Sequence, residues 1–138
     1  MSDSPASSAV RRDAALGESR GPGPVAVARL THGHVSWILG RADTGDIELV
    51  AIYEPDAGVA ERYAAAFGFD RRLVHDDLGK MLDAVKPSAV LAFGSIAEHL
   101  AVAEAAAPRG IHVMVEKPLA FRSDDARAIA VLARRYGI

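Results

Sequence analysis

The segment Ile111-His112-Val113-Met114-Val115-Glu116-Lys117-Pro118-Leu119-Ala120 decides the fold, because its apolar run ends abruptly in an acid, an amine and a proline. The run Ile111–Val115 lacks regular alternation, which predicts a strand covered on both faces. Pro118 has no amide hydrogen for a strand ladder, so the strand must end there. We therefore expect Lys117 at the carboxyl end of a central strand, where open α/β sheets bind their ligands.

Strand-like apolar runs alternate with helix-like segments along most of the chain. Neighbouring parallel strands need crossover helices of this kind. We therefore predict an α/β fold, a doubly wound parallel sheet of the Rossmann type, with about five strands in the order 3-2-1-4-5. The expected strands are 25–28, 47–53, 72–74, 88–93 and 111–115.

Several expected helices are bounded by residues suited to capping. The first is predicted to start at Val35, with apolar spacing that continues to Ala42. Asp56 is expected to be the N-cap of the second helix, which ends at Gly68, a residue suited to a left-handed C-cap. Ser123 is expected to cap the last helix.

Residues 1–24 and 25–138 differ in composition. The first segment is rich in small and polar residues without periodicity, so we expect a disordered tail before one nucleotide-binding domain over 25–138. The net charge of -2 provides no basic field for nucleic acid or an acidic membrane. The chain has no cysteine and no apolar run long enough to span a bilayer. We expect a cytoplasmic protein without nucleic-acid or membrane partners.

The turn after the first strand lacks the glycines of the usual dinucleotide-binding turn. In a Gly-x-Gly-x-x-Gly turn, backbone amides meet the pyrophosphate, and the corresponding positions here are Arg29, Thr31 and His34. Gly33 can supply the close approach, and the Thr31 hydroxyl can donate to phosphate. Arg29 either neutralises phosphate or blocks the turn by its bulk. We predict an altered cofactor site that includes His32; the alternative is a turn that keeps the fold and binds poorly.

Glu54 ends the second expected strand, roughly 20 to 25 residues beyond the first turn. A carboxylate at this place accepts hydrogen bonds from an adenosine ribose and repels a 2′-phosphate. Glu54 therefore predicts NAD as the cofactor, with NADP disfavoured. The alternative is a solvated acid at the end of a strand.

The histidines on either side of Gly33 are residues that often bind metal ions. No cysteine is available, and no acidic ligand stands at an evident spacing beside His32 and His34, so we expect no metal site. Trp37 lies on the same helical side as His34 and is expected to be partly exposed. The Trp37 side chain either packs on a loop of this domain or forms a contact surface for a part that is missing from this sequence.

The segment Glu116-Lys117-Pro118-Leu119-Ala120 resembles the Glu-Lys-Pro motif of the Gfo/Idh/MocA oxidoreductases, the glucose–fructose oxidoreductase and inositol dehydrogenase family. The resemblance runs from Val25 to Ile138. It implies that Lys117 lies beside the nicotinamide and the substrate hydroxyl and assists proton transfer while hydride moves. Desolvation and a cationic nicotinamide both disfavour an ammonium there, whereas Glu116 favours it.

The resemblance also assigns residues that follow the fourth strand. The family usually carries a Thr-Pro pair and then a histidine; here Gly94 and Ser95 replace the pair, and His99 matches the spacing of the histidine. These residues and Glu116 are therefore expected at the cofactor, in the crevice where the strand order reverses. For His99 the alternative is a surface histidine on an alanine-rich helix.

Members of the family have a second, larger α+β domain that forms the wall of the substrate pocket, and none of it is recognisable in this sequence. The resemblance implies a small-molecule substrate, a sugar, polyol or related hydroxy or carbonyl compound. It also implies a separate or missing C-terminal substrate domain as partner, and negligible activity for the chain alone. The alternative is a non-catalytic nucleotide-binding or interaction module.

Overall fold

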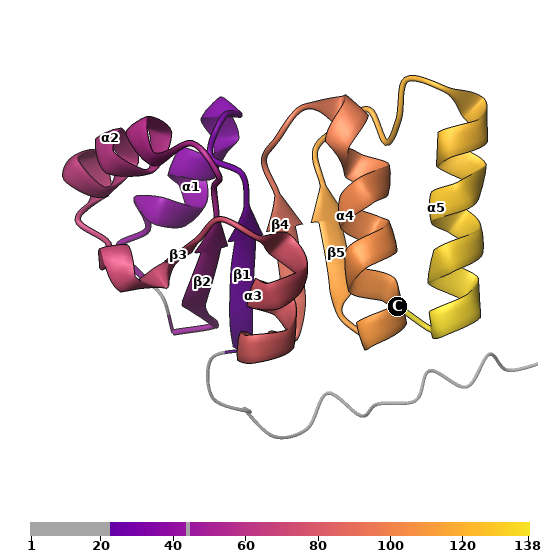
Figure 1. Cartoon of the computed structure of the whole chain (residues 1–138), viewed down its shortest axis with the longest axis horizontal. Helices are drawn as coiled ribbons and strands as arrows, with labels where there is room; N and C mark the ends of the chain where they lie inside the picture. Colours follow the sequence, from indigo (N-terminus) through magenta and orange to yellow (C-terminus); the bar gives the residue numbers. More distant parts are fainter. Residues whose placement is uncertain (1–22, 44) are drawn as a thin grey trace, which may run out of the picture.

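The computed structural model describes residues 23–43 and 45–138, which form one parallel sheet in the predicted order β3-β2-β1-β4-β5 (Figure 1). The strands are β1 (Gly23–Ala28), β2 (Ile47–Tyr53), β3 (Val74–His75), β4 (Ala89–Ala92) and β5 (His112–Val115). The α-helices are α1 (Ser36–Leu39), α2 (Ala57–Phe67), α3 (Leu78–Val85), α4 (His99–Ala106) and α5 (Ser123–Tyr136). Short 3₁₀ turns are η1 (Gly33–Val35), η2 (Arg71–Leu73), η3 (Ile96–Glu98) and η4 (Ala107–Arg109).

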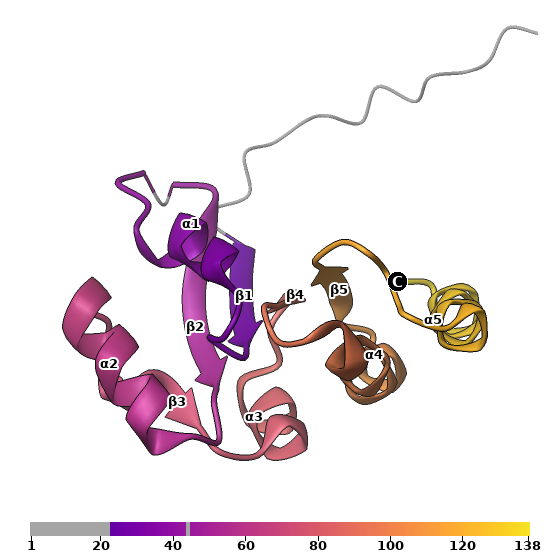
Figure 2. The same ribbon diagram turned by 90° about the horizontal axis from the view of Figure 1, so that it is seen from above.

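Helices cover both faces of the sheet, with α1 and α2 on one face and α3 and α4 on the other, while α5 packs on α4 (Figure 2). Alternation along β1 sends Val27 to the first face and Ala26 and Ala28 to the second. Fully burying one large aliphatic side chain stabilises the fold by about 1.5–3 kcal/mol. None of the helices in the described ranges has the length and apolar character that a membrane crossing needs.

The strand β5 differs from the expected central strand. Among the described strands it is at one edge of the sheet and pairs only with β4. His112 and Met114 are exposed, Met114 by 40%, because α4 packs on one side of β5 and no described helix lies over the other (Figure 2). The prediction of a strand buried on both faces is therefore wrong: an apolar run shows that a strand is partly buried, but not how many faces are covered.

Two element boundaries also differ from the predictions. Gly23 and Pro24 already belong to β1 and lie in register with Ile47 and Glu48, so the sheet starts two residues before the expected domain boundary. The rest of the predicted disordered tail, residues 1–22, lies outside the described residues. The helix α1 ends at Leu39 and does not continue along the apolar spacing that the sequence suggested.

The predicted caps are confirmed at α2 but not at α5. The Asp56 carboxylate accepts hydrogen bonds from two amides of the first turn of α2, at 2.8 and 3.0 Å, and these bonds hold the pKa of Asp56 below its usual value. Gly68 ends α2 with a φ of 72°, the left-handed conformation that favours glycine. Ser123 is the first residue inside α5, and the preceding residue, Arg122, makes no side-chain cap bond.

Candidate functional site

The residues that the sequence singled out gather at the carboxyl edge of the sheet. The loops after β1, β2, β4 and β5 all leave this edge, because every strand of the sheet is parallel (Figure 1). These loops carry residues 29–34, Glu54, residues 94–99 and residues 116–117. Segments that are far apart in the sequence therefore share one edge, as an open α/β sheet requires of its ligand site.

Glu54 is buried at the end of β2, with 2% of its surface exposed. Its Oε1 accepts a hydrogen bond of 2.5 Å from Arg29 Nη1 and one of 3.1 Å from the Asp56 amide. Its Oε2 accepts one bond, of 3.0 Å, from the Leu30 amide. The alternative of a solvated strand-end acid is therefore wrong, because this carboxylate is held inside the protein by a cation and two backbone amides.

Arg29 occupies the first position of the glycine pattern and adopts a φ of 71°, a left-handed conformation that costs a non-glycine residue about 1–2 kcal/mol. Its side chain, 19% exposed, lies between two carboxylates: Glu54, and Glu98, whose Oε1 is 2.9 Å from Arg29 Nε. Sequence reasoning placed Arg29 at a phosphate or in the turn and missed this pairing. The only signal was one arginine in the glycine position and one acid at the end of the next strand.

The segment after β4 is shaped around the Arg29 side chain. A Cβ at Gly94 would lie 2.5 Å from Glu98 Oε2 and 2.9 Å from Arg29 Cγ, so a larger residue there would force these two side chains to shift. The amide of the following residue, Ser95, donates to Glu98 Oε2 at 2.7 Å. Gly94 and Ser95 therefore hold the carboxylate that meets Arg29, which gives both residues a structural role at the predicted site.

In the turn after β1, two residues are exposed to solvent and two are fixed by hydrogen bonds. Thr31 and Gly33 are exposed, and a Cβ on Gly33 would meet nothing within 4 Å. The His32 amide donates to the Phe93 carbonyl at 2.7 Å, and His32 Nδ1 accepts a bond of 3.2 Å from the His34 amide. The turn therefore leaves open space beside Gly33 while both imidazoles keep defined positions.

The end of β5 approaches the same turn. Glu116 Oε1 lies 3.0 Å from His34 Nδ1, a contact between residues that are 82 positions apart. Lys117 is exposed, its peptide bond with Pro118 is cis, and in the described ranges it makes no hydrogen bond or ion pair. Glu116 therefore directs its charge to His34 rather than to its neighbour Lys117.

His99 does not lie on the surface. It is completely buried at the start of α4, and its Nδ1 lies 3.0 Å from the Leu119 carbonyl in the loop after β5. Its Nε2 is also buried and has no hydrogen-bond partner among the described residues. The alternative of a surface histidine is therefore wrong; His99 ties α4 to the loop that follows Lys117.

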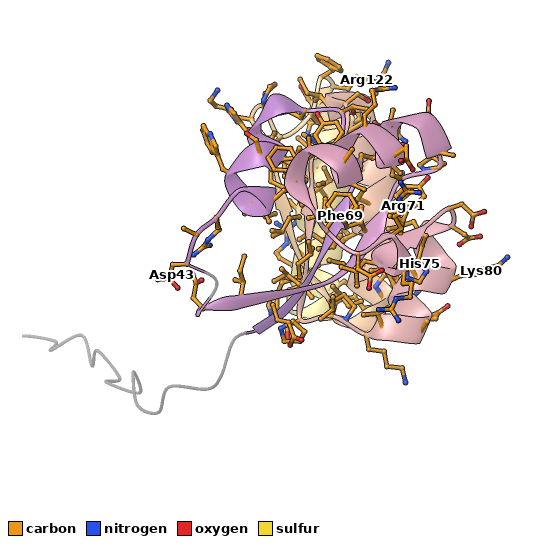
Figure 3. The ribbon with its side chains drawn as sticks, turned by 90° about the vertical axis from the view of Figure 1, so that its left-hand side faces the viewer. Asp43, Phe69, Arg71, His75, Lys80 and Arg122 are labelled. Atoms are coloured by element: carbon orange, nitrogen blue, oxygen red, sulfur yellow. The ribbon has the colours of Figure 1, made fainter. Side chains whose placement is uncertain are left out.

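A cavity of about 540 Å³ opens beside Glu54, between α2 and β3. Figure 3 looks onto this side of the molecule, where Arg71 and His75 are labelled. The lining is mixed in charge and polarity and consists of Glu54, Pro55, Ala57, Ala60, Glu61, Arg71, Val74, His75 and Asp76. Sequence reasoning did not predict this cavity, because its walls come from segments that only the fold brings together.

Comparisons with known proteins show what this chain is similar to. A family model described as "Oxidoreductase family, NAD-binding Rossmann fold" matches residues 27–138. The dTDP-3,4-didehydro-2,6-dideoxy-alpha-D-glucose 3-reductase of Streptomyces antibioticus is 37% identical over 93 residues, which are 67% of this chain and 27% of that protein. The D-glucoside 3-dehydrogenase of Escherichia coli K12 is 35% identical over 104 residues, 75% of this chain and 28% of that protein.

Solved structures share the fold. The WlbA dehydrogenase of Bordetella pertussis, in complex with NADH and UDP-GlcNAcA, aligns with a TM-score of 0.72 at 24% identity, over 84% of this chain and 35% of that chain. The myo-inositol 2-dehydrogenase of Lactobacillus plantarum aligns with a TM-score of 0.69 at 20% identity, over 83% of this chain and 34% of that chain. At these identities the likeness is evidence of the fold alone.

The family match covers the described domain almost completely, from β1 to the end of α5. The chain spans little more than a quarter of the length of the two curated relatives. Fold, strand order and family match agree with the resemblance that the Glu-Lys-Pro segment indicated. The chain belongs to the Gfo/Idh/MocA oxidoreductase family and forms its NAD-binding Rossmann domain.

Proposed function

We propose that this domain holds NAD along the carboxyl edge of its sheet as part of an oxidoreductase that transfers hydride to or from a sugar, polyol or related compound. The observation that carries the proposal is the convergence of Glu54, the turn 31–34 and Lys117 at that edge, in a chain of an NAD-binding family. Both curated relatives are named for position 3 of a glucose-derived sugar. We therefore include a ring hydroxyl or carbonyl at that position among the substrates.

Some of the residues at the carboxyl edge can contact NAD in the positions that they already occupy. The exposed Thr31 and the open space beside Gly33 leave room for a pyrophosphate. A carboxylate has about four acceptor positions, and Glu54 uses three of them, so Oε2 retains capacity for a ribose hydroxyl. This capacity is buried inside the protein, and the partly exposed Arg29 side chain is bonded to the other oxygen, Oε1, of the same carboxylate.

Arg29 would therefore have to move when the ribose reaches Glu54. Its guanidinium is already in contact with Glu98, which would keep the charge paired during the movement. Its new position would face the crevice, where a cation stabilises phosphate. In this proposal Arg29 closes the site before binding and contacts phosphate afterwards, while Glu54 disfavours a 2′-phosphate.

Lys117 is the proposed catalytic residue. NAD supplies the hydride chemistry when bound, and the protein's own task is to move one proton at the reacting hydroxyl or carbonyl oxygen. The Lys117 amine is exposed at the end of β5 and forms no ion pair with any described residue, because the carboxylate of its neighbour Glu116 contacts His34 instead. His99 would support this arrangement by holding the loop after Pro118, and not by touching the cofactor.

Calorimetric titration of the chain with NAD and with NADP tests the proposal. We expect NAD to bind more tightly, and Glu54→Ala to weaken NAD binding about tenfold or more, because a hydrogen bond to a charged group contributes about 1.5–3 kcal/mol. Glu104→Ala, which changes an exposed glutamate on α4, is the matched control and should change neither affinity. Circular dichroism verifies that each variant folds.

Two outcomes would contradict the proposal. Equal affinity of the parent chain for the two cofactors would remove Glu54 from the ribose. Binding of neither cofactor would favour the second candidate function, a non-catalytic interaction module. The observation in favour of that alternative is the Arg29 side chain, which already neutralises Glu54 from within the protein.

A further inference from the structure

Three side chains with metal-ligating atoms meet where the turn after β1 faces the end of β5. They are His32, His34 and Glu116, and one ligand atom from each lies within 4.8 Å of the other two. The sequence expectation of no metal site depended on the absence of an acidic ligand near the histidine pair. The fold supplies that acid from 82 residues away.

The distances between the ligand atoms are close to those of a tetrahedral zinc site. Zinc bonds to nitrogen and oxygen of about 2.0–2.2 Å place two ligand atoms roughly 3.3–3.6 Å apart in a tetrahedral site. His34 Nδ1 and Glu116 Oε1 are 3.0 Å apart, so an ion can replace the proton between them with little movement. The ligand atom of His32 lies within 4.8 Å of the other two, so it must approach by about 1.5 Å at most.

Both imidazoles are positioned before any ion arrives. The His34 ring stacks on Trp37, with centroids 3.9 Å apart and planes inclined by 16°. The His32 ring meets His34 edge-on at 4.6 Å, and the His32 amide is bonded to the Phe93 carbonyl. This stack gives Trp37, although 66% exposed, a role in holding His34. Ligands that are already ordered lose less conformational freedom when they bind.

The charge of Glu116 is available to an ion. Among the described residues, Glu116 has no lysine or arginine partner, since Arg29 is engaged by Glu54 and Glu98. Two imidazoles and one carboxylate are a ligand set that binds catalytic zinc and leaves a fourth position open. All three side chains are half-buried, which lowers the competition from water while leaving a path to solvent.

We propose that His32, His34 and Glu116 bind one divalent transition-metal ion, with zinc as the best match. The site joins the turn after β1 to the end of β5, so the ion would link the cofactor turn to the segment that carries Lys117. This inference uses only the three side chains and does not depend on cofactor binding.

The test is a titration of the metal-free full chain, made without a histidine tag, with Zn²⁺ and with Co²⁺. We expect one ion per chain and a visible Co²⁺ spectrum of tetrahedral type. His34→Gln, which keeps a hydrogen-bond donor toward Glu116, and Glu116→Gln should each weaken Zn²⁺ binding more than about tenfold. His112→Ala removes an exposed histidine outside the cluster and should leave the affinity unchanged.

A second readout separates metal binding from damage to the fold. Zn²⁺ should raise the thermal unfolding temperature of the parent chain and of His112→Ala, but not that of His32→Asn, whose side-chain oxygen can still accept the bond from the His34 amide. Parent affinity no tighter than that of folded His34→Gln would overturn the proposal. So would a Co²⁺ spectrum that stays the same in Glu116→Gln.

Discussion

The carboxyl edge of the sheet has two ends, one beside β1 and β2 and one beside β5, and they differ in whether their charged side chains are buried and paired. Beside β1 and β2, Glu54 is buried and its carboxylate is held by Arg29 and two amides. Beside β5, Lys117 is exposed and the neighbouring Phe121 is 73% exposed. The first end is closed by groups within the domain, whereas the second presents a lysine and apolar surface without cover from the described residues. In the proposed function, the first end binds the nucleotide, and the second end, which carries Lys117, supplies one wall of the catalytic site.

The largest expected effect belongs to the open end. We predict that the isolated chain forms negligible NADH with D-glucosides, because one wall can neither orient a substrate nor exclude water. Fusion to the remaining portion of the Escherichia coli relative should restore turnover, and Lys117→Ala should lower kcat in that fusion by about 10²- to 10⁴-fold. NADH absorbance measures both.

The control for this comparison is Lys80→Ala, which changes an exposed lysine on α3 and should leave turnover unchanged. Rapid turnover by the isolated chain would contradict the one-wall interpretation. A fusion that tolerates Lys117→Ala would remove the lysine from the chemistry.

The next effect concerns the closed end. Removing one partner of a buried ion pair costs about 3–5 kcal/mol, and relief of the left-handed strain at position 29 offsets about 1 kcal/mol. We therefore predict that Arg29→Gly lowers the free energy of unfolding by about 2–4 kcal/mol, measured in urea at pH 7. Adding Glu54→Gln should recover part of the loss, because a neutral amide needs no cation.

Lys117→Ala is the matched control for stability and should change the free energy of unfolding by no more than about 0.5 kcal/mol. If Arg29→Gly is as stable as the parent, the Arg29–Glu54 pair does not stabilise the closed end. If Lys117→Ala is the less stable variant, the contrast between the two ends is reversed.

The smallest effect is a difference in acid between the β2–α2–β3 segment, which adjoins the closed end, and α5, which follows the open end. The pKa is lowered at Asp46, Asp56, Asp70 and Asp83, chiefly by hydrogen bonds from Arg41, the Val59 amide, Arg72 and Arg109 respectively. A depressed folded pKa stabilises the protein above the ordinary aspartate value of about 3.9, and this stability is lost as the pH falls through the folded pKa. Three of the four carboxylates lie between residues 46 and 70.

We therefore expect acid to loosen the β2–α2–β3 segment before α5. Hydrogen exchange at about pH 5 and about pH 3, corrected for intrinsic rates, measures this, with the amides of α5 as the internal reference. Earlier opening of α5, or equal protection of both segments at both pH values, would contradict the assignment of acid sensitivity to these carboxylates.

The amino-acid sequence by itself determined the sheet, its order and the family. Those features follow from local information: apolar runs of strand length, a proline that ends β5, Asp56 at the start of α2 and Gly68 at its end. Each can be recognised within a few residues, because strand length, capping and left-handed turns depend on local backbone geometry. The placement of Glu54 and Lys117 at one edge follows from the parallel order of the strands.

Only the tertiary structure decided which charges meet. Arg29 pairs with Glu54 across 25 positions, His34 meets Glu116 across 82, and His99 is buried against the loop after β5. The exposed face of β5 is also a tertiary result, since it depends on which helices cover the edge strand. Such contacts depend on the path of loops and the direction of single side chains. A one-residue change of turn would alter them while leaving the hydrophobic pattern, and so the predicted fold, unchanged.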